Sequence, residues 1–439
     1  MRGDRSEKGG KGEKGGWFGR LVHSVRGGAG RERPRPGQLI WPRREDTWRD
    51  YPADGLTPSR LVQILRAADE GAIDLAIQLY EQMEEKDAHL YSVAQTRRLG
   101  LTGLEWQVIS AGEVHEGIDR APAEEAADYC RRRLATLDRF EQALRHLALA
   151  LGRNVSVVEI VWDIVGGHHE VVDLVPVDFG RLAVDDLGRI RILTRESPYE
   201  GIVPPPNKFI LHTPQSASGH PMRGGLLRVS ALAYLAKHFA MKDWLVFAEV
   251  FGMPIRVARY EPSATPEEKR ELLRMLRDLG SAAAGIFSKA VELEIKEVSK
   301  GPLGGPPYPS ICNFFNRELS KAWLGQTLTA DTAEMTGTYA AAEVHDRVRA
   351  DIREDDIRHE GWTIRRDLLG PMVRIRFGDS VPVPYFRRRF DRNNDPEKLA
   401  KVLSTAVNEL GARVPARWAH ETLGIPRAGQ GEEPLAGRR

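Results

Sequence analysis

The feature that most constrains the fold is a long apolar repeat that stops abruptly. Between Gly225 and Phe251, apolar residues recur every three or four positions, which predicts one continuous helix. These apolar positions are Leu227, Leu232, Leu235, Phe239, Trp244, Phe247 and Val250. The tripeptide Gly252-Met253-Pro254 follows at once, and proline cannot continue a helix. The chain therefore contains an expected helical rod with a sharply defined end.

A small strand–helix–strand unit is expected directly after this rod. Ile255–Tyr260 and Val291–Val298 alternate as strands do, and the capping box Thr265-Pro266-Glu267-Glu268 opens a helix between them. The linker GPLGGPPYP then leads into a second apolar helix over Ile311–Leu324. Two helices thus enclose a self-contained insert.

The part before the rod predicts helices beside a β-rich layer. Thr57-Pro58 is a helix start, with a break at Gly71, and a strand follows at Leu104–Ile109. One helix is expected over Pro122–Leu151. Residues 155–213 then change period: VSVVEIVW, a Gly-Gly turn and EVVDLVPVDF predict a hairpin, and RIRIL and KFILH predict further strands. The expected fold class is α+β.

A long charged helix is expected after the second rod. It should run from Tyr339 to about Leu369, with Pro371 ending it and a strand near Met372–Phe377 following. Its expected buried stripe is Val344, Val348 and Ile352. Asp395-Pro396 then opens a helix to Leu410, and Pro415 opens a short final helix.

Charge and composition restrict the possible partners. The 439 residues carry a net charge of only +2, so any DNA contact must come from local charge. Residues 1–50 are rich in Gly, Lys and Arg and predict a flexible, solvated arm, and residues 426–439 predict a disordered tail. Cys130 and Cys312 are expected to be buried free thiols. No apolar run is long enough to predict a membrane span.

The sequence holds no motif that predicts catalysis. It lacks a P-loop, a G-x-S-x-G elbow and an H-E-x-x-H helix, and His168-His169 in a hairpin turn would point to opposite faces. The acidic run at 351–360 could form a two-metal nuclease site, but interspersed arginines favour an exposed, salt-bridged helix. The acidic residues are Asp351, Glu354, Asp355, Asp356 and Glu360; the arginines are Arg347, Arg353 and Arg358. No catalytic residue, metal ion or cofactor is expected.

Several segments together resemble the portal proteins of Mu-like bacteriophages and prophages. The first is LTPSRLVQILRAADEGAIDLAIQLYEQMEEKDAHLYSVAQTRRLGLTGLEW. PPNKFILH, GGLLRV, KDWLVFAEVFGMPIRVARY and EEKRELLRMLRDLGSAAAGIF continue it in order, and SKAWLGQTLT and YAAAEVHDRVRADI complete it. The resemblance runs from about 57 to 425, whereas residues 1–50 match nothing in the family.

The resemblance implies a ring, usually of twelve copies, at one capsid vertex, with a subunit made of wing, stem helices, clip and small crown. The implied divisions are a wing over 51–225, an outgoing stem helix over 226–253, a clip over 254–300 and a return stem helix over 301–325. A tunnel loop and long wing helix would follow over 326–394, and the crown over 395–425. Such a protein is not an enzyme.

The resemblance also implies partners and a place. Double-stranded DNA would pass through the ring without sequence preference, and capsid and scaffold proteins would surround it. The terminase large subunit and later the neck or tail adaptor would dock on the clip, for which Arg270, Arg274 and Arg277 are candidate residues. The protein would act in the virion and in the host bacterial cytoplasm during assembly. A minor head or adaptor protein, or a metal-dependent nuclease, are the alternatives.

Overall fold

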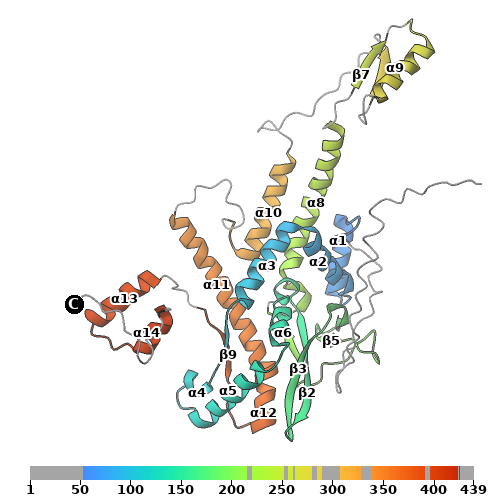
Figure 1. Ribbon diagram of the computed structural model, residues 1–439. Coiled ribbons are helices and arrows are strands. Elements are labelled where there is room, and N and C mark those ends of the chain that lie inside the picture. Colours follow the sequence, from blue (N-terminus) through green and yellow to red (C-terminus); the bar gives the residue numbers. More distant parts are fainter. Residues whose placement is uncertain are drawn as a thin grey trace, which may run out of the picture.

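The protein has a mixed helical and β-sheet body from which two helices project (Figure 1). The computed structural model describes residues 53–214, 220–251, 256–260, 263–278, 284–288, 307–327, 339–390, 396–423 and 425. The expected arm at 1–50 and tail at 426–439 lie outside these residues. The α+β class expected from the sequence is confirmed.

Three helices form the N-terminal part of the body: α1 (Pro58–Asp69), α2 (Asp74–Lys86) and α3 (Ala88–Thr102). Thr57 caps α1 as expected, because its hydroxyl accepts a hydrogen bond of 3.2 Å from the Arg60 amide. The break at Gly71 is confirmed. Gly71 has φ +98° and lies against the Val184 carbonyl, where a side chain would collide with the backbone.

The single helix expected over Pro122–Leu151 is wrong. The chain forms α5 (Arg120–Ala135), α6 (Phe140–Leu147) and α7 (Ala150–Arg153) instead; β1 (Trp106–Ile109) and α4 (Ala111–Val114) precede them. Thr136 ends α5, and the Phe140 amide donates to the Leu137 carbonyl at 3.1 Å in the turn. Leu137 and Phe140 are both buried there, so packing bends a segment whose apolar spacing is continuous.

The expected hairpin is confirmed as β2 (Ser156–Val165) and β3 (His168–Pro176). Gly166 and Gly167, with φ of +59° and +83°, form the tight turn between them. The strand β6 (Phe209–His212) joins the other edge of β2, giving the antiparallel order β3-β2-β6. RIRIL supplies β5 (Ile190–Ile192), which pairs with β4 (Leu182–Val184).

The long helix near the C-terminal end does not stop at Pro371. The helix α11 (Tyr339–Ile364) continues through one π-helical turn (Arg365–Leu369) into α12 (Gly370–Phe377). The strand expected at Met372–Phe377 is therefore wrong. Pro371 lies just after this π-helical turn, and the wider turn accommodates the proline ring within the continuing helix. The strand β9 (Tyr385–Arg388) then pairs with β1.

Two main apolar cores hold the body together. One core joins α1, α2, α8 and α10 around side chains such as Tyr80 and Trp323. The other fills the space between the β2–β3 hairpin, α5, α6 and α12, around Leu144 and Ile160. Both expected thiols, Cys130 and Cys312, are free and buried, as predicted.

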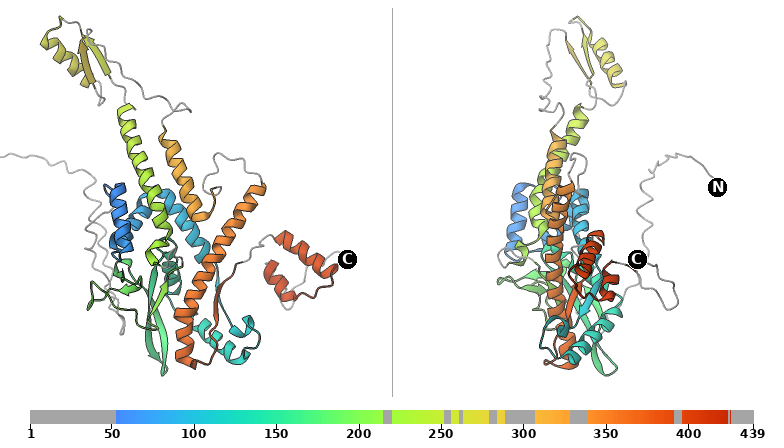
Figure 2. Two further views of the ribbon diagram at one scale, coloured as in Figure 1. Left: turned by 180° about the vertical axis from the view of Figure 1, so that it is seen from behind. Right: turned by 90° about the vertical axis from the view of Figure 1, so that its left-hand side faces the viewer.

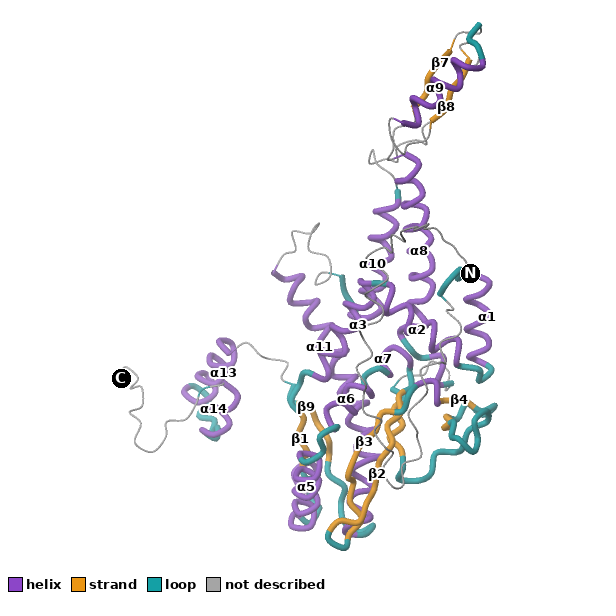
Figure 3. The backbone as a smooth tube through the Cα atoms, turned by 45° about the vertical axis from the view of Figure 1, so that its right-hand side comes forward, coloured by secondary structure: helices purple, strands orange, loops and turns teal. Residues whose placement is uncertain are grey.

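The inserted unit contains β7 (Arg256–Tyr260), α9 (Pro266–Asp278) and β8 (Ala284–Ser288), with β7 and β8 paired in parallel. Figure 3 shows this unit at the far end of α8 (Leu226–Phe251) and α10 (Tyr308–Leu324). The expected capping box is confirmed, since Thr265 and Glu268 exchange hydrogen bonds. The strand expected at Val291–Val298 lies outside the described residues, and β8 was not foreseen. The last two helices, α13 (Pro396–Asn408) and α14 (Ala416–Leu423), agree with expectation.

Candidate functional site: a projecting helix pair and its anchor

The helices α8 and α10 pack side by side and leave the body together (Figures 1 and 2). The first half of α8 is held in the body, where Leu227 and Tyr234 are buried. From Met241 to Val246 every side chain of α8 is exposed. The pair is therefore a rod that is fixed at one end and carries the inserted unit at the other.

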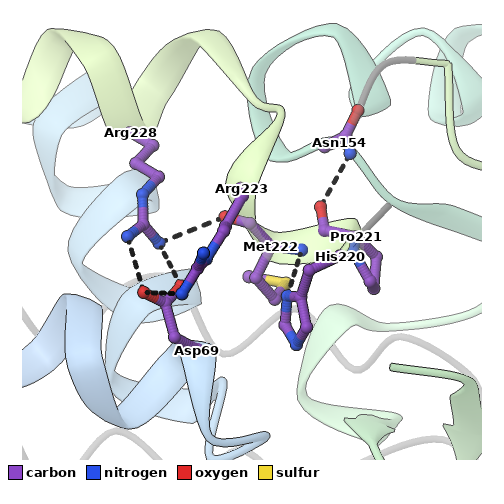
Figure 4. Close-up of polar contacts among 7 residues, drawn as sticks. All are labelled: Asp69, Asn154, His220, Pro221, Met222, Arg223 and Arg228. Carbon is purple, nitrogen blue, oxygen red and sulfur yellow. Dashed lines mark hydrogen bonds and ion pairs between the residues drawn. The ribbon is translucent and has the colours of Figure 1, made fainter. Parts of the chain in front are cut away.

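The fixed end of α8 is tied to α1 by a carboxylate held between two arginines (Figure 4). Arg228 donates to both oxygens of Asp69, at 2.8 and 3.0 Å, and Arg223 lies 3.3 Å from the same carboxylate. Partial burial raises the pKa of Asp69, but the hydrogen bonds and charges of the two arginines outweigh it, and the net pKa is lowered. Asp69 is thus ionised at neutral pH and clamps the start of α8.

The segment just before α8 is fixed by short polar contacts and one close backbone approach. Asn154 Nδ2 donates to the Pro221 carbonyl at 2.7 Å, and His220 Nδ1 accepts from the Met222 amide at 3.2 Å (Figure 4). Gly225 lies against the Gly152 carbonyl so closely that a β-carbon would overlap it. Only glycine fits at this position, which sets where α8 begins.

The two helices are also tied to α3. Lys237 of α8 donates to the buried Asp87 carboxylate at 2.7 Å. On α10, the Trp323 indole donates to Ser230 of α8 at 3.0 Å, and its carbonyl accepts from Arg97 of α3 at 3.0 Å. These contacts link α3, α8 and α10 where the rod enters the body.

The free end of the rod carries the arginines expected to dock a partner. Arg270 is exposed and pairs with Glu267 at 2.6 Å, both on α9, and Arg274 is exposed on the same helix. The side chain of Arg277 lies outside the described residues. Because the Arg270–Glu267 pair is fully solvated, it contributes little to folding. Both described arginines are accessible to a partner.

The acidic run at 351–360 is only partly the exposed, salt-bridged helix that was expected. Glu354 does pair with Arg358 at 2.6 Å on the surface, but Asp356 and Glu360 are buried. The expected stripe is also wrong, because Val348 is exposed, Ile352 is half-buried, and the side chain of Val344 is not described. The buried side of α11 passes through Asp356, Ile357, Glu360 and Ile364 instead.

Each buried carboxylate meets an arginine from another element. Arg97 donates to both oxygens of Asp356, at 3.0 and 2.9 Å, and Arg388 of β9 donates to both oxygens of Glu360 at 2.8 Å. Burial raises the pKa of both carboxyls, and the arginines oppose this shift. Neither arginine was predicted from the sequence as a partner of these carboxylates. The available signal was the spacing of the two carboxylates, four residues apart and on the same side of the helix as Ile357 and Ile364.

Because Asp356 and Glu360 each bind an arginine, the acidic run at 351–360 does not offer a group of carboxylates that converge on one metal ion. Among the described residues, no three His, Cys, Asp or Glu side chains lie close enough to hold a metal ion. His168 and His169 are exposed at the tip of the hairpin. No helix in the described part of the chain is long and apolar enough to cross a membrane.

Comparisons with known proteins show which family this sequence matches. Residues 77–425 match the family described as the portal protein of Mu bacteriophage. The portal protein of Escherichia phage Mu is 30% identical over 383 residues, covering 86% of this chain and 72% of that protein. The Mu-like prophage FluMu protein gp29 of Haemophilus influenzae (strain ATCC 51907 / DSM 11121 / KW20 / Rd) is 30% identical over 393 residues, covering 88% and 74%.

Among solved structures, a chain of the virion of a native gene transfer agent particle is similar with a TM-score of 0.49 and 12% identity. It covers 89% of this chain and 96% of its own length. The HK97 family phage portal protein from Corynebacterium diphtheriae has a TM-score of 0.39 and 11% identity, covering 79% and 96%. Similarity at these levels carries no information about function.

The sequence matches define a class of virion structural protein, the phage portal proteins. Within that class, the chain belongs to the family of portal proteins of Mu bacteriophage. The resemblance of the sequence to this family is thereby confirmed, although the family match begins at residue 77 rather than near 57.

Proposed function

We propose that twelve copies of this chain form a closed ring at one vertex of a capsid. The observation that carries the proposal is the rod of α8 and α10, anchored in the body at Asp69 and Lys237 and bearing a separate unit at its far end. A ring of such rods would enclose a channel, with the inserted units displayed around one opening.

The expected divisions of the subunit fit this arrangement. We assign α8 and α10 to the two stem helices, the β7–α9–β8 unit to the clip, and α13 and α14 to the crown. The body that holds the fixed ends of the rod would be the wing, with α11 as its long helix. Capsid and scaffold proteins would contact this outer part, within the virion and in the host bacterial cytoplasm during assembly.

Double-stranded DNA would enter and leave through the channel without sequence-specific contacts. The chain carries 64 basic and 62 acidic residues, so its charges nearly cancel. Strong phosphate binding would make passage depend steeply on salt and would stall moving DNA. A near-neutral surface of mixed sign supports the role of a conduit, and the protein is proposed to have no catalytic activity of its own.

The ring is tested by mass photometry and negative-stain imaging of the purified chain. Closed rings with a central hole are expected, and class averages give the number of copies. A chain that stays monomeric across a wide range of protein and salt concentrations would contradict the proposal.

The face of α9 is proposed to dock the terminase large subunit and afterwards the neck or tail adaptor. Arg270 and Arg274 are exposed there, and Arg277 lies on the same helix. Partners that exchange on one site favour polar, moderate contacts, because charge complementarity affects the association rate more than the final affinity. The mixed charges of α9 suit such a surface.

The variant Arg274→Glu plus Arg277→Glu tests this docking face. Rings should form normally, whereas binding to the terminase large subunit should weaken, with a reduced dependence on salt. The matched control is Arg195→Glu plus Arg413→Glu, which reverses two exposed arginines far from α9 in sequence. If the α9 variant binds and packages DNA as the control does, α9 is not the docking face.

A further inference from the structure

The helix α8 is apolar on two opposite sides, and only one of them is covered. Leu227, Tyr234 and Leu235 pack into the body. On the other side, Val229 is 64% exposed and Leu232 is 67% exposed, and the row continues along the rod. We call this row the outer stripe of α8; it consists of Val229, Leu232, Ala236, Phe239 and Val246.

The outer stripe has the spacing of a helix-packing surface. Its members recur every three or four residues, so they stay on one side of the helix along most of its length. Asp243 occupies the one position of the series that is charged. A helix with apolar residues on both sides is normally buried all round, which indicates that something covers the outer stripe in the working protein.

The same chain exposes a second apolar surface on α3 and α10. Tyr91 and Leu99 of α3 are 52% and 59% exposed, and Phe314 of α10 is exposed as well. We call these three residues the α3 surface. In the right-hand view of Figure 2, α8 and α3 lie toward opposite sides of α10. The helices α3 and α10, which carry these three residues, contact each other directly.

We propose that the outer stripe of α8 in one copy packs against the α3 surface of the next copy. This inference rests on the proposed ring and names the surfaces that close it. A ring requires a head-to-tail contact in which two different surfaces of each copy meet, because a self-complementary surface would stop at a dimer. The two surfaces are mainly apolar and belong to different helices, and Asp243 gives the outer stripe one polar position.

Two variants of the full-length chain test the pairing. Leu232→Glu plus Val246→Glu places charges on the outer stripe, and Tyr91→Glu plus Leu99→Glu places them on the α3 surface. The matched control is Leu187→Glu plus Tyr199→Glu, because these apolar residues are even more exposed, at 75% and 90%, and belong to neither surface. Mass photometry measures the oligomer, and circular dichroism confirms that each variant is folded.

Each surface variant alone should be monomeric, while the control should form rings as the unchanged chain does. Mixing the two surface variants in equal amounts should produce heterodimers, because each then keeps the one surface that the other lacks. Dimers from the mixture, and none from either variant alone, are the result expected only of a head-to-tail contact. If a glutamate variant fails to fold, the corresponding alanine variant replaces it. Its rings should dissociate into monomers at a protein concentration at least tenfold higher than the concentration at which rings of the unchanged chain dissociate.

The failures can be told apart. If the unchanged chain forms no rings, the proposed function is wrong. If the unchanged chain forms rings and either folded surface variant does so equally well, the ring stands and this pairing is wrong. If both variants are monomeric but their mixture gives no heterodimer, the two surfaces do not face each other and the head-to-tail pairing is likewise wrong.

Discussion

Glu360 and Arg388 provide the sharpest test of how the body is held together. Their side chains are 2% and 1% exposed, and two hydrogen bonds of 2.8 Å join them. Arg388 also donates to the Leu104 carbonyl at 2.7 Å. The substitution Glu360→Gln keeps the size of the side chain but removes its charge, so a guanidinium remains buried without a counter-charge.

The expected cost follows from this burial. Removing one partner of a buried ion pair destabilises a protein by about 3–5 kcal/mol, because the remaining charge stays desolvated. The variant Glu354→Gln, on the same helix, is the matched control. Its ion pair with Arg358 is partly solvated, with Arg358 68% and Glu354 29% exposed, and an exposed pair contributes about 0–1 kcal/mol. The two substitutions make the same chemical change, one in a buried ion pair and the other in a pair whose arginine is exposed.

Thermal unfolding followed by circular dichroism compares the two variants. A change of 1 kcal/mol shifts the melting temperature of a large domain by about 2–4 °C, so Glu360→Gln should lower it by roughly 6–20 °C. Glu354→Gln should lower it by less than about 4 °C. If the two variants melt within about 2 °C of each other, the buried pair does not stabilise the body as argued.

Three further changes probe the anchor of α8 and the pH response. Asp69→Asn should cost about 2 kcal/mol by weakening hydrogen bonds to two arginines, and a melting temperature unchanged from the parent would contradict this. Gly225→Ala should cost about 1–3 kcal/mol because the added methyl overlaps the Gly152 carbonyl. Gly100→Ala, on α3, is the control, because an added methyl there meets only the Arg353 side chain at 3.4 Å; equal melting temperatures of the two variants would argue against the overlap. Burial lowers the pKa of His146 from 6.5 to about 4, so this side chain is protonated at a lower pH in the folded state than in the unfolded state. The contribution of neutral His146 to the free energy of unfolding should therefore be fully present above pH 6.5 and should fall by about 3 kcal/mol as the pH drops to about 4. The variant His146→Gln should lose this pH dependence of stability between pH 6.5 and about 4. If its stability depends on pH as the parent's does, His146 is not the group responsible.

Local signals in the sequence were sufficient for the elements that depend on neighbouring residues. The cap at Thr57, the Gly166-Gly167 turn and the capping box at Thr265 are all where the residues predict them. A side-chain cap or a left-handed turn involves only residues a few positions apart, so the chain itself carries the information. The rod over 225–251 follows in the same way from its apolar period.

Errors occurred where long-range packing overrode the local pattern. The apolar spacing over Pro122–Leu151 is continuous, yet the chain turns after Ala135 so that α6 can pack on the sheet. Pro371 should end a helix, but a π-helical turn lets α11 pass into α12. Neither outcome has a marker within a few residues, because both depend on surfaces contributed by distant elements.

The acidic helix marks the boundary between what sequence and tertiary structure decide. The sequence by itself determined that 351–360 is a helix carrying carboxylates and arginines, and that the chain resembles the Mu portal family. Only the tertiary structure decided that Glu354 stays partly exposed while Asp356 and Glu360 are buried. The reason is distance along the chain: Arg97 is 259 residues from Asp356, so no local pattern can show that folding brings the two charges together.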